Sequence, residues 1–173
     1  MAAGAAGGPS KGTAVVTTPT DTQVLITREF AASPHAVYRC FTEPELIRRW
    51  WGGNMGENVA AEVDLRVGGR WRFTMVAGGH DVNFHGEYRE IVPDVRFVTT
   101  EVYEGEPGGG APALCTYTFT DSAGGRRTML HLLTELPSRE VRDGMLNSGM
   151  EVGVQACYDL LEELAIGLDA ADR

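Results

Sequence analysis

The sequence predicts an α+β fold in which a curved antiparallel β-sheet of six to seven strands wraps around one long C-terminal α-helix. Three observations support this prediction. The middle of the chain holds several segments in which apolar and polar residues alternate, each bounded by glycine or proline. Hardly any helical pattern separates these segments, which is typical of an antiparallel sheet. The last segment instead repeats apolar residues every three or four positions, which indicates an amphipathic helix.

One strand and two short helices are expected before the main run of strands. Residues 24–30 are β-prone and partly alternating, so they are predicted to form the first strand. Ser33 followed by Pro34 is typical of a helix start, because serine caps the helix and proline fits its first turn. Thr42 and Glu45 have the spacing of a capping box, which indicates a second helix start.

The remaining strands are expected between residues 58 and 134, where paired glycines and a Pro-Asp step mark the turns. The expected strands are residues 58–63, 70–75, 82–92, 95–103, 114–120 and 128–134. Because a strand side chain repeats its direction every two residues, alternation assigns each side chain to one face of the sheet. The residues expected on the concave face are Trp71, Phe73, Met75, Phe84, Tyr88 and Tyr117.

The long helix is expected at residues 148–168. Ser148 and Glu151 have capping-box spacing, so the helix is predicted to begin there. A helix of this length spans roughly 28 Å, which is enough to cross a sheet. Its apolar stripe steps by four and three residues through Met150, Val154, Cys157, Leu161, Leu164 and Leu168. The opposite face is expected to be exposed to water and carries Glu151, Gln155, Asp159, Glu162 and Glu163.

One helix cannot fill the whole concave face of a twisted sheet of this length. Either large side chains fill the remaining space, since protein interiors are closely packed, or a cavity remains. Aromatic and methionine side chains suit a cavity that accepts apolar ligands. One of the adjacent Trp50 and Trp51 is expected to anchor the short helices, and the other is a candidate gate. The residues predicted to bind a ligand are Trp50, Trp71, Phe73, Met75, Phe84, Tyr88, Phe97, Glu101, Tyr117, Met150, Val154 and Cys157.

Glu101 is the candidate catalytic or polar binding residue. By strand alternation it shares a face with Phe97 and Tyr103. On the concave face its carboxyl group would have a raised pKa and could hydrogen-bond a ligand or act as a general base. On the convex face it would be solvated or paired with Arg70 or Arg72. We favour the convex position, because an unseen bulge reverses the alternation of a strand.

Length, composition and charge limit the number of domains and the classes of binding partner. The 173 residues suit one domain, expected at residues 21–170, after a disordered tail at residues 1–20. The net charge of −9 makes nucleic acid and anionic membranes poor partners. Neither a signal peptide nor a transmembrane run is recognisable, so we expect a cytoplasmic monomer or homodimer.

The cysteine and histidine patterns indicate neither a metal nor a cofactor. Cys40, Cys115 and Cys157 are widely spaced and are expected to be reduced, packed thiols. The four histidines match no metal-ligand spacing. No phosphate loop, dinucleotide fingerprint or nucleophile elbow is present. A single lysine among many arginines, with abundant alanine and glycine, suggests a bacterial source.

Several motifs occur in a recognisable order. They are Trp50-Trp51-Gly52, the run from Asp64 to Trp71, the run from Phe84 to Tyr88, and Ser148-Gly149-Met150-Glu151 leading into Tyr158-Asp159-Leu160-Leu161. Together they resemble the SRPBCC (START-like) superfamily, in the branch named for the activator of Hsp90 ATPase (AHSA1-like), over about residues 24–168. The resemblance implies a helix-grip (START/Bet v1-like) fold with a pocket between the sheet and the long helix. Many relatives carry an aromatic residue where this chain has Val154, a departure that would widen or repack the pocket.

Three functions are compatible with this resemblance, because the fold hosts carriers, enzymes and co-chaperone modules. We favour binding of an apolar or aromatic small molecule, one version being a polyketide-type natural product in biosynthesis or self-resistance. The second is a polyketide cyclase-like or aromatase-like enzyme that uses Glu101, Tyr88 or Tyr117 as an acid or base. The third is a co-chaperone or other protein-interaction module.

Overall fold

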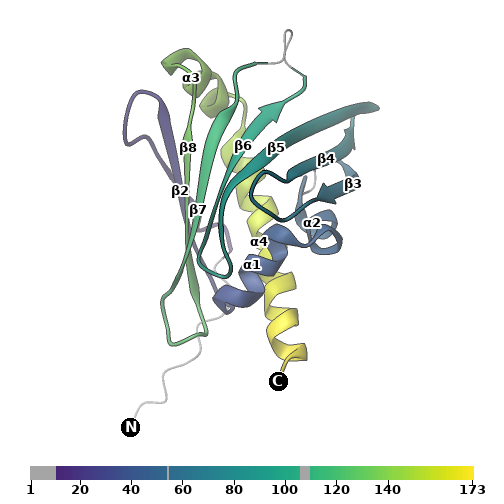
Figure 1. Cartoon of the computed structure of the whole chain (residues 1–173), viewed down its shortest axis with the longest axis vertical. Coiled ribbons are helices and arrows are strands. Elements are labelled where there is room, and N and C mark those ends of the chain that lie inside the picture. Colours follow the sequence, from purple (N-terminus) through teal and green to yellow (C-terminus); the bar gives the residue numbers. More distant parts are fainter. Residues whose placement is uncertain (1–10, 54, 106–109) are drawn as a thin grey trace.

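The computed structural model describes residues 11–53, 55–105 and 110–173. Its helices are α1 (Pro34–Thr42), α2 (Pro44–Trp50), α3 (Arg139–Asn147) and α4 (Met150–Ala171). Its strands are β1 (Val15–Thr17), β2 (Gln23–Phe30), β3 (Glu57–Val63), β4 (Arg70–Ala77), β5 (His80–Val92), β6 (Arg96–Tyr103), β7 (Ala113–Asp121) and β8 (Thr128–Glu135). The predicted α+β fold with two short helices after the first main strand is confirmed (Figure 1).

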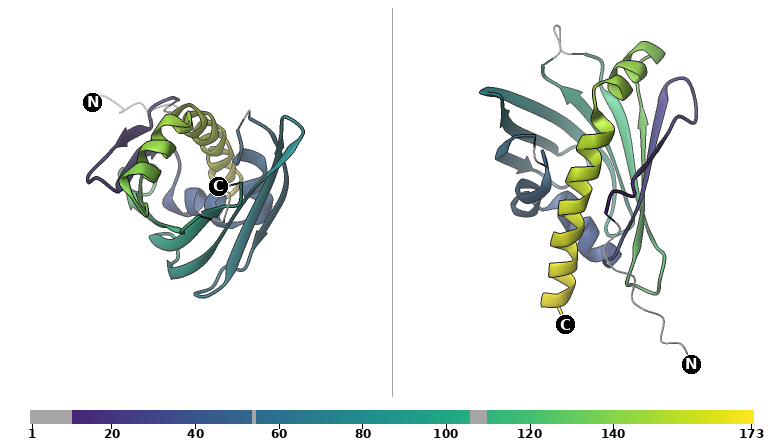
Figure 2. Two further views of the ribbon diagram at one scale, coloured as in Figure 1. Left: turned by 90° about the horizontal axis from the view of Figure 1, so that it is seen from above. Right: turned by 180° about the vertical axis from the view of Figure 1, so that it is seen from behind.

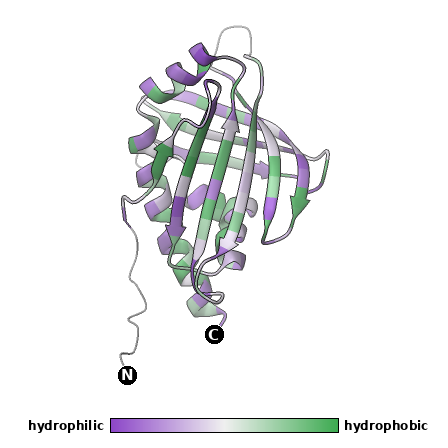
Figure 3. Ribbon diagram, turned by 90° about the vertical axis from the view of Figure 1, so that its left-hand side faces the viewer, coloured by the Kyte–Doolittle hydropathy of each residue, from purple (hydrophilic) through white to green (hydrophobic). Residues whose placement is uncertain are grey.

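One sheet holds all eight of these strands, in the order β1-β2-β8-β7-β6-β5-β4-β3. Every neighbouring pair is antiparallel. Seen from above, the sheet curls around α4, and α1 and α2 close the lower part of the concave side (Figures 1 and 2). The strands are banded by hydropathy, as alternation predicts for a sheet with one face turned to the core (Figure 3).

The strand count of six to seven was too low because β1 lies within the predicted disordered tail. Val16 of β1 pairs with Ile26 of β2, and the residue before β1 is held by α4. There Ala14 is buried, and its backbone N–H and carbonyl oxygen both bond the Gln155 side chain, at 3.0 and 2.7 Å. These contacts come from the far end of the chain, so local composition gives no sign of them. Residues 1–10 of the expected tail lie outside the described residues.

The helix start at Ser33 is confirmed, but the capping box at Thr42 is wrong. The Ser33 hydroxyl oxygen accepts a hydrogen bond from the Ala36 backbone N–H at 3.2 Å. Thr42 still belongs to α1, where its hydroxyl donates to the Tyr38 carbonyl oxygen at 2.9 Å. Glu43 takes the cap position of α2 without a side-chain bond, so Pro44 alone marks that start.

The capping box at Ser148 is wrong for the same reason. The Ser148 hydroxyl donates to the Met145 carbonyl oxygen at 2.6 Å and so ends α3 instead of beginning α4. Gly149 separates the two helices in the left-handed region, with φ of 81°. Glycine adopts this conformation without the steric cost that a Cβ atom brings. The capping-box spacing of Ser148 and Glu151 therefore occurs at the junction of α3 and α4, where no capping box forms.

The polar face of α4 was expected to be exposed to solvent, but most of its predicted residues are not. Arg28 of β2 is buried beside it and donates to Asp159 at 2.9 Å and to Glu162 at 3.0 Å. Glu162 is 0% exposed and also accepts the Ala31 backbone N–H at 2.9 Å. The carboxylates of this face therefore fasten the helix to β2 and the segment after it, and only Glu151 and Glu163 of the predicted set are exposed.

Candidate functional site

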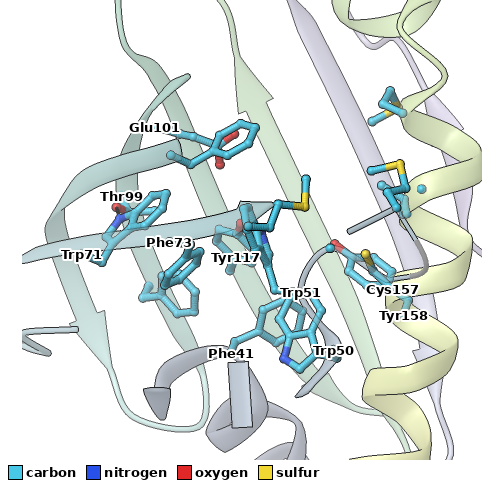
Figure 4. A pocket seen from close by; sticks show the side chains of 18 of the residues that line it. Phe41, Trp50, Trp51, Trp71, Phe73, Thr99, Glu101, Tyr117, Cys157 and Tyr158 are labelled. Carbon is cyan, nitrogen blue, oxygen red and sulfur yellow. Dashed lines mark hydrogen bonds between the residues drawn. The ribbon is translucent and has the colours of Figure 1, made fainter. Parts of the chain in front are cut away.

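A cavity of about 260 Å³ lies between the concave face of the sheet and α4 (Figure 4). Strands β4 to β7 form one wall, and α4 forms the opposite wall with the segment that follows α2. All twelve residues named from the sequence line it: Trp50, Trp71, Phe73, Met75, Phe84, Tyr88, Phe97, Glu101, Tyr117, Met150, Val154 and Cys157. The large side chains therefore leave part of the space between the sheet and α4 open.

Strand register explains why the sheet residues converge. Phe73 of β4 pairs with Phe84 of β5, and Trp71 pairs with Gly86, without an irregularity between them. Paired residues of neighbouring strands point to the same face, so the aromatic rings of the two strands meet. The Trp71 and Phe73 ring centroids lie 4.6 Å apart, and Trp51 packs edge-on against both Phe73 and Phe84. One wall of the cavity is thus a continuous aromatic surface.

The indole of Trp71 is held in place by a glycine and a threonine. It lies directly over Gly86, where a Cβ atom would come within 2.6 Å of the indole nitrogen. The indole N–H donates to the Thr99 hydroxyl oxygen at 2.6 Å, and Thr99 in turn donates to the Glu87 carbonyl oxygen at 3.1 Å. The polar atom of Trp71 is satisfied within the wall, which leaves the ring itself for the cavity.

The two adjacent tryptophans have different surroundings. Trp50 is buried and donates its indole N–H to the Cys40 carbonyl oxygen at 2.7 Å. Its ring also packs against Phe41 and Tyr158. Trp50 is therefore the expected anchor of the short helices. Trp51 is partly exposed at the cavity, and its role as a gate stays a prediction.

Glu101 lies on the concave face, which corrects the favoured convex position. The register between β6 and β7 is continuous from Arg96 to Glu101, so no bulge reverses the alternation there. Figure 4 shows Glu101 on the sheet side of the cavity, across from Cys157 and Tyr158 on α4. Its side-chain contact is the Cys115 thiol, with Sγ 3.9 Å from Oε2. Arg72, one of the expected partners, pairs instead with Glu104 at 2.9 Å.

Burial sets the ionisation of the groups around the cavity. Desolvation raises the pKa of the Glu101 carboxyl group, and the Cys115 thiol offsets part of this effect. Burial also raises the pKa of Tyr88, Tyr117 and Tyr158, so their hydroxyl groups stay protonated at neutral pH. The cavity is thus lined by neutral phenols and by a carboxyl group whose neutral form is favoured by burial, beside the Thr99 hydroxyl and the Cys157 thiol.

The Glu101→Gln variant is expected to gain stability over the parent chain as the pH rises above 4.5, the ordinary pKa of this carboxyl group. Between that pH and the raised pKa, the folded chain keeps a proton that the unfolded chain has released, so the stability of the parent falls with pH. Above the raised pKa the difference is constant, at about 1.4 kcal/mol per pH unit of the shift. Urea unfolding of both chains over a pH series measures it. A difference that does not depend on pH would contradict the buried carboxylic acid.

The residues predicted to bind a ligand leave out part of the lining, including Trp51, which was named only as a candidate gate. The additional residues are Phe41, Trp51, Gly52, Met55, Thr99, Gly153 and Tyr158. A signal existed for Thr99, which has the same alternation as Glu101 in β6. Met55 and Gly52 lie outside helices and strands, so no periodicity places them. Tyr158 is four residues after Val154 and three before Leu161, so helical spacing did carry a signal for it.

The described part of the chain supports neither a metal site nor a membrane-spanning helix. No three His, Cys, Asp or Glu side chains gather there in a way that could hold a metal ion. None of the helices described is long and apolar enough to span a bilayer.

Solved structures share this architecture. A protein from Rhodobacter sphaeroides is 22% identical, with a TM-score of 0.79 over 91% of this chain and 99% of that chain. A Nitrosomonas europaea protein is 21% identical, with a TM-score of 0.77 over 88% and 99% of the two chains. A Mycobacterium smegmatis protein is 23% identical, with a TM-score of 0.76 over 87% and 94%. Identities this low show the fold alone.

The family is shown by sequence. No curated protein matches the chain. The sequence model of the family described as activator of Hsp90 ATPase homolog 1-like protein matches residues 31–165, which include α1, α2 and most of the sheet and α4. The chain therefore belongs to the activator of Hsp90 ATPase homolog 1-like family, within the START-like superfamily.

Proposed function

We propose that the protein binds an apolar or aromatic small molecule in the cavity between the sheet and α4. The observation that carries this proposal is the cavity itself, with its aromatic, aliphatic and sulfur-containing walls. Protein interiors normally close to crystal-like density, so an open space among large rings needs an explanation. Two of the rings, Trp50 and Trp71, are fixed by hydrogen bonds, which keeps them from collapsing into the space.

The volume limits the size of the ligand. A cavity of about 150 Å³ holds benzene, so a space of about 260 Å³ holds on the order of ten non-hydrogen atoms. A compound with one or two rings fits this volume. A polyketide of several fused rings does not, unless the cavity widens when it binds. The size therefore favours a smaller aromatic compound over the polyketide version of the proposal.

The cavity reaches the surface at Met55. This side chain lines the cavity and is 54% exposed, so it stands between the interior and the solvent. It covers Gly153 of α4, where a Cβ atom would lie 3.3 Å from the Met55 methyl carbon. Methionine is flexible and unbranched, which suits a side chain that moves aside when a ligand enters.

Val154→Trp is expected to abolish binding, because an indole at this lining position occupies the space that the ligand needs. Val152→Trp is the matched control, since Val152 lies on the same helix, is 77% exposed and is not part of the cavity. Native mass spectrometry of the purified chains detects a ligand that copurifies, and calorimetry with indole measures binding directly. We expect at least a tenfold loss of indole affinity for Val154→Trp and none for Val152→Trp. A parent chain that neither retains a compound nor binds indole would contradict the proposal.

An enzymatic function is the second candidate, because its three candidate groups all line the cavity: Glu101, Tyr88 and Tyr117. Burial raises the pKa of Glu101 from its ordinary acidic value, which suits a general acid or base in this cavity. If the copurified compound is recovered unchanged after prolonged incubation, the carrier is favoured over the enzyme. A cavity between the sheet and α4 lends no support to the co-chaperone alternative, which needs an exposed contact face.

A further inference from the structure

The lining of the cavity has one acidic side chain and no basic one. Among the described residues that form it, there is no lysine, arginine or histidine beside Glu101. A ligand with a carboxylate or phosphate would therefore meet a carboxyl group without a compensating cation. Acidic ligands are disfavoured by this arrangement.

Glu101 has no charged partner among the described residues, unlike the nearby carboxylates on the surface. Glu104 lies three residues away and pairs with both Arg72 and His85. Glu87, opposite β6 on the neighbouring strand, pairs with Arg89 at 3.0 Å. Glu101 has only the weak contact with the Cys115 thiol. A partly buried carboxyl group in an apolar wall lowers stability unless it is paired, so its position indicates a partner that the chain does not supply.

The remaining walls suit a cation. Aromatic faces attract an ammonium group through the negative potential above the ring, and desolvation strengthens this attraction. The rings of Trp51, Phe73 and Phe84 pack against one another in the same cavity that holds Glu101. The net charge of −9 also favours the approach of cations over anions.

We propose that the ligand is a small aromatic or apolar molecule that carries a basic amine, and that Glu101 pairs with its ammonium group. The proposal rests on the binding function proposed above. The Glu101 carboxyl group transfers its proton to the lone pair of the neutral amine, which leaves a carboxylate and an ammonium ion in contact. No other reactant is required.

The pH dependence of ligand affinity follows from which groups near Glu101 gain or lose a proton. Tyr117 from β7, Tyr88 from β5, and Cys157 and Tyr158 from α4 line the same cavity, and Cys115 from β7 contacts Glu101. Burial raises the pKa of each of these groups. These groups stay neutral over the physiological range, which leaves Glu101 and the amine as the pair that exchanges a proton. Affinity is then highest between the pKa of Glu101 and that of the amine.

Calorimetry with phenethylamine and phenethyl alcohol tests the proposal, because the two probes share shape and differ in charge. The parent chain is expected to bind the amine about 10- to 100-fold more tightly than the alcohol, as a charged hydrogen bond does. Glu101→Gln is expected to abolish this preference, and circular dichroism shows whether the variant folds. Glu87→Gln removes one surface carboxylate and is expected to keep the full preference.

The outcomes separate this proposal from the one on which it rests. Equal binding of the two probes, or tighter binding of the alcohol, overturns the amine and leaves the apolar binding function standing. A preference for the amine that Glu87→Gln and Glu101→Gln reduce equally shows a long-range charge effect and also overturns the contact. Binding of neither probe, with no copurified compound, overturns both proposals.

Discussion

Arg28→Met is expected to lower the free energy of unfolding by about 3–5 kcal/mol, because it removes the guanidinium that pairs with a buried carboxylate. Glu162 is 0% exposed and lies 3.0 Å from the Arg28 guanidinium. Asp159 loses its 2.9 Å ion pair in the same variant. Methionine fills part of the volume of the arginine stem, so the loss reports mainly on charge. Urea unfolding monitored by circular dichroism measures the difference.

A double variant and a surface control identify the cause. Arg28→Met combined with Glu162→Gln removes both charges, and glutamine still accepts the Ala31 N–H, so this chain is expected to recover much of the lost stability. Arg89→Met breaks an exposed pair with Glu87 and is expected to cost no more than about 1 kcal/mol. Equal losses for Arg28→Met and Arg89→Met would show that the network does not fasten α4 to β2.

Much of the cavity could be predicted because it depends on local alternation. Trp71, Phe73 and Met75 are two residues apart in an uninterrupted strand, so their common face follows from the geometry of β4 alone. The apolar stripe of α4 likewise places Met150 and Val154 toward the sheet. The side of Glu101 was misjudged because it depends on whether a bulge intervenes. The register between β5 and β6 shifts once, between Tyr88 and Glu90, and this irregularity lies on β5 and not on β6.

Contacts between distant segments could not be predicted. From the sequence, Glu162 was assigned to the water-exposed face of the helix, and Arg28 of the first strand was given no partner. Both are reasonable for a single element, since single charged residues are seldom fully buried. Only their pairing makes the burial possible, and the two residues lie 134 positions apart. The strand β1 was missed for the same reason, because Gln155 of α4 holds the residue before it.

Gly86→Ala is expected to lower the free energy of unfolding by about 3 kcal/mol or more, because the new methyl group has no space. Its Cβ atom would lie 1.8 Å from the Thr100 carbonyl oxygen, and a backbone atom cannot move away as a side chain does. Strands β5 and β6 would have to separate. The indole of Trp71 would also be displaced from its hydrogen bond with Thr99.

This displacement links the stability of the wall to the function of the cavity. A Trp71 ring that leaves Gly86 has the cavity beside it, so we expect Gly86→Ala to weaken indole binding at temperatures where the chain is still folded. Gly167→Ala is the matched control, because a Cβ atom there meets nothing within 4 Å. In a helix, this change is expected to stabilise the chain by about 0.5–1 kcal/mol. Suppose that Gly86→Ala has the same free energy of unfolding and the same indole affinity as the parent. The close contact of Trp71 with the β5 backbone is then not what keeps the cavity open.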